Sequence, residues 1–143
     1  MMSESPKCFP VQGYREVEHT ADWELEVWAA DLPGLIEQAT RGMYALSGTR
    51  LELDGQITRT INISAIDSES ILVGFLQEVL FLGEMESLGF DKFVFTLQPE
   101  GLSAVLTGGQ IRSLDKEIKA VTYHNLKIEK TQRGLEAHIV FDV

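Results

Sequence analysis

The sequence predicts an α+β fold: a single compact domain with a mixed or mostly antiparallel β-sheet and two main helices. Several stretches alternate apolar and polar residues with a period of two, which indicates half-buried strands. Two longer stretches carry apolar residues at helical spacing. These elements follow one another as strand, helix, strand, helix and then a run of strands. That order is typical of α+β proteins.

Both helices are expected in the first two thirds of the chain. Asp31 is placed to cap the first helix, Pro33 is tolerated in its first turn, and Gly48 is a good stop. Asp67 offers an N-cap to the second helix. The apolar face of this helix, within residues 71–82, is wide, so we expect the helix to pack on more than one side.

The last third of the chain is expected to consist of strands. The longest is predicted over residues 118–129, with His124 on its apolar face, and Gly108-Gly109 is expected to interrupt the strand pattern before it. Gln132-Arg133-Gly134 is a hairpin turn into a final strand that carries Asp142. The other expected strands cover residues 14–18, 23–27, 57–65, 93–97 and 102–106.

Length and composition limit the classes of function. A chain of 143 residues fits one domain, and we expect a flexible arm over residues 1–13 and the folded domain over residues 14–143. Twelve Lys and Arg face 22 Asp and Glu, which gives a net charge of -10 without a basic cluster. Direct, tight nucleic-acid binding is therefore disfavoured, whereas divalent cations and basic protein surfaces suit this charge.

Cysteine usage and hydropathy favour a cytoplasmic protein. Cys8 has no second cysteine to pair with, so a reducing compartment is expected. The first residues lack the basic and apolar regions of a signal peptide. The longest apolar stretch, around residues 71–82, is too short and too polar to span a membrane, so no membrane association is expected.

Three segments occur together in a telling order. They are Glu18-His19-Thr20-Ala21-Asp22, the stretch 117–124 (Glu-Ile-Lys-Ala-Val-Thr-Tyr-His), and Phe141-Asp142-Val143. With the acidic start of the second helix, residues 67–72, they resemble the archease family over residues 14–143. No single tetrapeptide here is specific, but the ordered set is. Residues 73–75 and 108–116 depart from the usual pattern of the family.

The resemblance implies a protein that is not an enzyme itself and that activates one. Archeases act beside the tRNA-splicing and RNA-repair ligase, which joins RNA ends bearing a 2′,3′-cyclic phosphate or 3′-phosphate to 5′-hydroxyl ends. They promote guanylylation of this RNA ligase by GTP and so support multiple turnover on its RNA. Two other classes stay open: a chaperone-like modulator of an RNA- or DNA-modifying methyltransferase, and a stand-alone metal-dependent hydrolase.

The resemblance also implies a bound divalent metal, with calcium expected first and magnesium or manganese as alternatives. The ligands fall on Asp22, Asp142 and the chain-terminal carboxylate of Val143, and the functional lysine falls on Lys119. Carboxylate oxygens are the donors that such hard cations prefer. His19, Thr122 and His124 are expected to support this site by hydrogen bonding to the ligands and orienting them.

Each of these residues also has a purely structural interpretation. Asp22 is suited to closing a turn, Asp142 to an exposed strand end, and Lys119 to a solvated strand position. A zinc site is disfavoured, because the histidines lack the usual ligand spacing and Cys8 lies in the expected arm. His124 then fits a buried, hydrogen-bonded histidine or one that orients a ligand.

Overall fold

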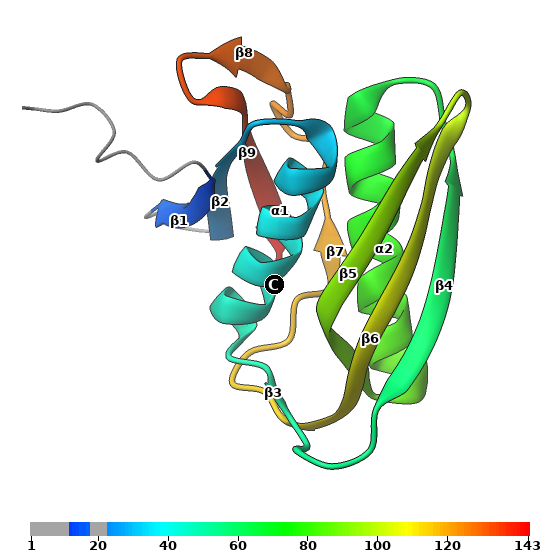
Figure 1. Ribbon diagram of the computed structural model, residues 1–143. Coiled ribbons are helices and arrows are strands. Elements are labelled where there is room, and N and C mark those ends of the chain that lie inside the picture. The colour runs from blue at the N-terminus through cyan, green and yellow to red at the C-terminus, as the bar shows by residue number, and fades with distance from the viewer. Residues whose placement is uncertain (1–11, 18–22) are drawn as a thin grey trace, which may run out of the picture.

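Two β-sheets with two helices between them make up the protein (Figure 1). The computed structural model describes residues 12–17 and 23–143. The first sheet contains β1 (Gly13–Val17), β2 (Trp23–Ala29), β7 (Ala120–Val121), β8 (Glu129–Thr131) and β9 (Gly134–Asp142). The second contains β3 (Arg50–Leu51), β4 (Ile57–Ser64), β5 (Leu88–Gln98) and β6 (Gly101–Ser113).

Strand β9 organises the first sheet, and β6 organises the second. β9 pairs with β2, β7 and β8, while β1 pairs with the other edge of β2. β6 pairs with β3, β4 and β5. Within the described residues every strand pairing is antiparallel. The predicted α+β class is therefore confirmed.

The two helices begin and end close to where their capping residues predict. Helix α1 (Leu32–Ser47) follows Asp31, whose side chain accepts a hydrogen bond from Gly34 N at 2.9 Å. It ends at Gly48, which adopts a left-handed conformation with φ 66°. Helix α2 (Ser68–Glu86) follows Asp67, which accepts from Ser70 N at 3.0 Å. No described helix has the length and apolar character needed to cross a membrane.

One hydrophobic core joins the sheets through the helices. α1 packs on β1 and β2, α2 packs on β4, β5 and β7, and the helices contact each other. The wide apolar face of α2 is thus used on several sides, as predicted. Phe75 from α2 is fully buried and meets Phe95 of β5 edge to face, with ring centroids 5.4 Å apart.

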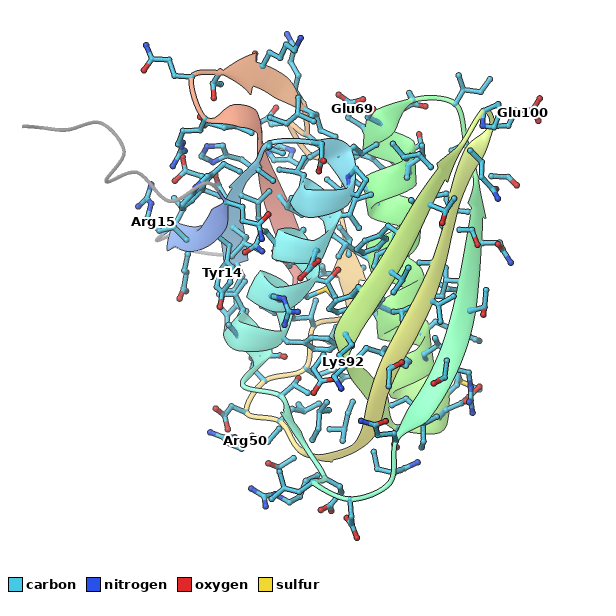
Figure 2. All side chains as sticks on the ribbon, viewed as in Figure 1. Tyr14, Arg15, Arg50, Glu69, Lys92 and Glu100 are labelled. Atoms are coloured by element: carbon cyan, nitrogen blue, oxygen red, sulfur yellow. The ribbon has the colours of Figure 1, made fainter. Side chains whose placement is uncertain are left out.

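The prediction of one long strand over residues 118–129 is wrong. Only Ala120–Val121 form β7, and the chain then turns away, with Asn125 at a positive φ of 53°. Side chains of α2 take the backbone donors of this segment. Gln77 Oε1 accepts from Val121 N at 3.1 Å, and Glu69, in the first turn of α2 (Figure 2), accepts from Ile128 N at 3.0 Å. These bonds hold the segment against α2 instead of extending the ladder.

The interruption expected at Gly108-Gly109 is also wrong, because β6 runs through both residues. A side chain at Gly108 would collide with the backbone of Gly89 and Phe90 in β5. Gly108 therefore allows a close approach of two paired strands next to the irregularity between Phe90 and Lys92.

Gly42 and Gly83, one in each helix, should respond oppositely to alanine. Alanine is favoured over glycine in a helix by about 1 kcal/mol. A Cβ at Gly83 would meet only ordinary contacts at 3.6 Å, so Gly83→Ala should stabilise the fold by about 0.5–1 kcal/mol. A Cβ at Gly42 would lie 2.5 Å from Cδ2 of buried Leu25, so Gly42→Ala should cost about 1–3 kcal/mol. Urea unfolding measures both, and a stabilised Gly42→Ala protein would contradict the packing described between α1 and β2.

Candidate functional site

The end of the β7–β9 ladder brings two of the predicted site residues together. Ala120 pairs with Asp142 and Val121 pairs with Phe141. Lys119 N donates a hydrogen bond of 2.8 Å to the carbonyl oxygen of Asp142. Lys119 and Asp142 are both exposed. A lysine and an aspartate that are 23 positions apart in sequence therefore leave adjacent points of the sheet.

The position of β7 is fixed by contacts that a sequence pattern does not reveal. Gln77 of α2 holds Val121 N from one side. Thr122 N and Thr122 Oγ1 both donate to the carbonyl oxygen of Val140, each at 3.0 Å. Thr122 thus holds the chain against β9 at Val140, which lies two residues before Asp142. Its expected role in supporting a metal site stays a prediction.

His124 does not lie on a buried strand face, so its expected burial is wrong. It follows the end of β7 and is exposed, because the chain turns away from β9 after Thr122. Its backbone N–H donates to Thr122 Oγ1 at 3.2 Å, and its ring lies 3.3 Å from the amide of Asn125. Val143 is half-buried and packs its side chain against the core.

Two predicted residues, His19 and Asp22, lie outside the described residues. Their roles as ligand and support stay predictions. Trp23, the next residue after Asp22, pairs with Phe141, the residue before Asp142. Within residues 12–17 and 23–143, no three or more His, Cys, Asp and Glu side chains are grouped as a metal site. Of the expected side-chain ligands, the described part supplies Asp142 alone.

The outer face of the first sheet carries a charged network next to this site. Glu26 of β2 pairs with His138 of β9 in the ladder, and His138 Nδ1 lies 2.7 Å from Glu24 Oε2. The Arg133 guanidinium donates to Glu26 at 2.9 Å and lies 4.0 Å from the ring centroid of Trp28. Asp142 belongs to the same alternating set of β9 as His138, so it faces the same side.

The match to a known family covers the domain. Residues 14–143 fit the model of the archease protein family. The chain is a member of the archease family. This finding confirms the family named from the three sequence segments.

Individual archeases are similar along nearly their whole length. The chain is 34% identical to protein archease of Methanosarcina acetivorans over 94% of this chain and 99% of the relative. It is 28% identical to the archease-like protein of Dictyostelium discoideum over 93% and 95% of the two chains.

Solved archease-type structures share the fold. Protein 1598 of Methanobacterium thermoautotrophicum superposes with a TM-score of 0.70 at 24% identity, over 92% of this chain and 99% of that one. The archease of Thermotoga maritima, described as a possible chaperone, gives 0.69 at 23% identity over 90% and 96%. At this level of identity the likeness establishes the fold alone.

Glu136 should make the stability of the protein depend on acid pH. Hydrogen bonds from Arg133 and then Thr131 lower the pKa of Glu136 from 4.5 to about 2. Because the folded-state pKa lies below the unfolded-state value, this carboxylate stabilises the fold above pH 4.5, and the effect is lost as pH falls toward 2. As the pH is lowered from 7 to 2.5, the unfolding temperature should therefore fall less steeply for Glu136→Gln than for the unchanged protein. Parallel curves for the two proteins would contradict this, and Glu100→Gln, at an exposed position in the turn between β5 and β6, is the control.

Proposed function

We propose that this protein activates an RNA ligase by presenting Lys119 and a divalent cation, held by Asp142 and Asp22, to the nucleotide site of the ligase. The hydrogen bond from Lys119 N to Asp142 O carries the proposal, because it sets the backbones of an exposed lysine and an exposed aspartate side by side at the sheet edge. Membership of the archease family supports the same assignment.

The register of the first sheet supports a shared site for Asp142 and Asp22. Trp23, the residue after Asp22, lies opposite Phe141, the residue before Asp142, so the described end of β2 lies beside the end of β9 that carries Asp142. Calcium takes roughly six to eight oxygens. The remaining ligands would come from the carboxylate of a chain ending at Val143, from water and from the ligase.

The chemistry of guanylylation explains why such a site helps a ligase. Transfer of GMP from GTP to a protein nucleophile builds negative charge on phosphate oxygens, which a divalent cation neutralises. The ammonium group of Lys119 adds a second positive charge, carried by a residue whose backbone is fixed at the sheet edge. The protein would thus act on the loading of the ligase with nucleotide.

A chaperone-like action on a basic client is the second candidate. The net charge of -10 and the description of the Thermotoga maritima relative as a possible chaperone favour it. The two candidates differ in what they require at the sheet edge. Shielding of a client depends on overall charge, whereas activation depends on the individual side chains of Lys119 and Asp142.

Asp142→Asn should remove most of the stimulation. Asparagine keeps the size of the side chain and loses the charge that holds a cation. We expect the rate of GMP transfer to limiting ligase to fall by about tenfold or more, as one lost charge-stabilising group typically costs. Labelled GTP gives the rate. Asp54→Asn, an exposed position in the loop before β4, is the matched control. Equal stimulation by the Asp142 and Asp54 variants would favour the chaperone-like action.

Lys119→Ala should lower stimulated guanylylation by a large factor, on the order of tenfold or more, because the positive charge of this residue at the sheet edge is lost. Lys92→Ala removes an exposed lysine from β5, in the other sheet (Figure 2), and should change nothing. Both variants are compared at several concentrations with the ligase limiting. Stimulation that survives in Lys119→Ala would exclude this lysine from the mechanism.

A further inference from the structure

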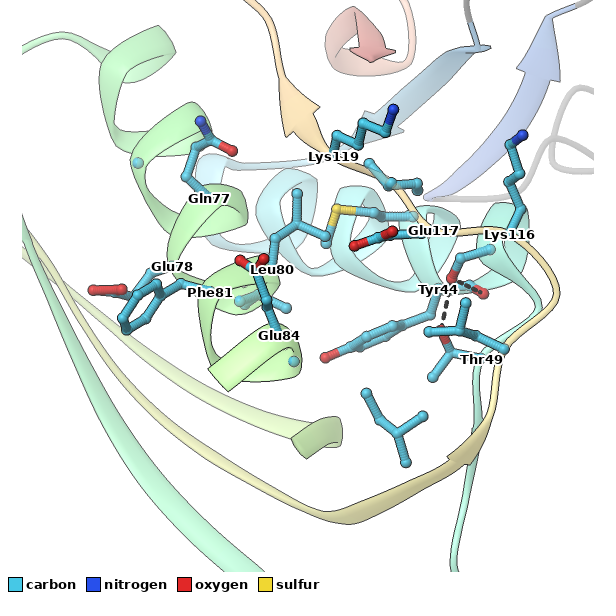
Figure 3. A pocket seen from close by; sticks show the side chains of 18 residues that line it. Tyr44, Thr49, Gln77, Glu78, Leu80, Phe81, Glu84, Lys116, Glu117 and Lys119 are labelled. Atoms are coloured by element: carbon cyan, nitrogen blue, oxygen red, sulfur yellow. Dashed lines mark hydrogen bonds between the residues drawn. The ribbon is translucent and has the colours of Figure 1, made fainter. Parts of the chain in front are cut away.

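A cleft of about 800 Å³ opens between the second half of α2, the end of α1 and residues 114–119 (Figure 3). Its apolar lining is incompletely covered. Phe81 of α2 is 52% exposed and Leu114 is 44% exposed, and both line the cleft. The other apolar side chains of the lining include Met43, Leu80, Ile111 and Ile118.

Carboxylates without partners surround this apolar lining. Glu78, Glu84 and Glu117 line the cleft, and in the described part of the chain none of them pairs with a cation. Glu86, in the same helix, does pair, with Arg59 at 2.9 Å. Unpaired acids concentrated on an apolar cleft indicate a surface that is complementary to a positive group.

The lysines of the lining leave the acidic part open. Figure 3 shows Glu84 and Glu117 turned toward the cleft, whereas the amino groups of Lys116 and Lys119 point away from its floor. The segment that carries both lysines is tied at its two ends. Asp115 N and Lys116 N donate to Ser47 O at 2.8 and 3.1 Å, and Lys119 N donates to Asp142 O. The cleft therefore extends up to the lysine of the proposed site.

The chemistry of the lining selects one kind of occupant. The three carboxylates outnumber the two lysines of the lining, which disfavours phosphate-bearing ligands, and a second copy of this chain brings a net charge of -10. An arginine or lysine offers an apolar stem to Phe81 and Leu114 and a cation to Glu84 and Glu117. A protein segment that combines such a residue with an apolar neighbour fits both parts of the cleft.

We infer that this cleft docks an exposed segment of the RNA ligase, composed of an apolar residue next to an arginine or lysine. This inference rests on the proposed function, because it takes the ligase as the partner. Docking here holds the ligase against the segment that ends at Lys119, so that the sheet edge faces the nucleotide site. The cleft supplies affinity, and the sheet edge supplies activation.

The test separates affinity from activation. The double variant Glu84→Lys/Glu117→Lys reverses both inward charges, and Phe81→Ser removes the exposed aromatic ring. Glu52→Lys/Glu100→Lys makes the same change in net charge at exposed positions outside the cleft, with Glu100 at the far turn between β5 and β6 (Figure 2). Binding to immobilised ligase gives Kd, and guanylylation gives both the half-maximal concentration and the maximal rate. Thermal unfolding checks that each variant is folded.

We expect Kd and the half-maximal concentration to rise by about tenfold or more in both cleft variants, with the maximal rate kept. The control should change them less than about twofold. Equal Kd values for the cleft variants and the unchanged protein would overturn the cleft assignment. Binding without any stimulation by the unchanged protein would overturn the proposed function, and Kd would still decide the cleft. An absence of binding by the unchanged protein would overturn both. If the double variant fails to fold, Phe81→Ser decides.

Discussion

The pairing of β9 on both of its edges is the constraint on which the rest of the site depends. Its inner residues, such as Ile139 and Phe141, are fully buried, so the register against β2 cannot shift by one residue without exposing the core. That register turns Asp142 outward. On the other edge, the short pairing with β7 places Ala120 opposite Asp142, and the backbone of Lys119 bonds to the carbonyl oxygen of Asp142. One strand thus contributes to the buried core on one face and positions the backbones of Lys119 and Asp142 at its end.

Local signals in the sequence were sufficient for most of the fold. Asp31, Gly48 and Asp67 act through bonds to residues within a few positions, so their types predict where α1 and α2 begin and where α1 ends. The alternation around Leu25 and around Ile139 predicts strands because one face of each strand is buried. The family, and with it the candidate residues Lys119 and Asp142, came from three short segments that kept their order.

What the sequence could not show depends on distant contacts. Gln77 bonds to Val121 across 44 positions, and Glu69 bonds to Ile128 across 59. Alternation alone predicted a long strand there, but these two side chains end it. The expected burial of His124 fails for the same reason, because the strand that would bury it does not extend that far. The cleft also has no linear signal, because its acids come from α2 and from the segment 114–119, which only folding brings together.

Under the proposed function, the cleft supplies affinity for the ligase and the sheet edge supplies activation. Asp142 is exposed at the end of β9, so a cation that it helps to hold would stay open to further oxygen ligands from the ligase. Affinity for the ligase would then come from elsewhere on the surface. The segment 114–119 makes that possible, because its backbone bonds to Ser47 O at one end and to Asp142 O at the other. It forms a wall of the cleft and ends at Lys119.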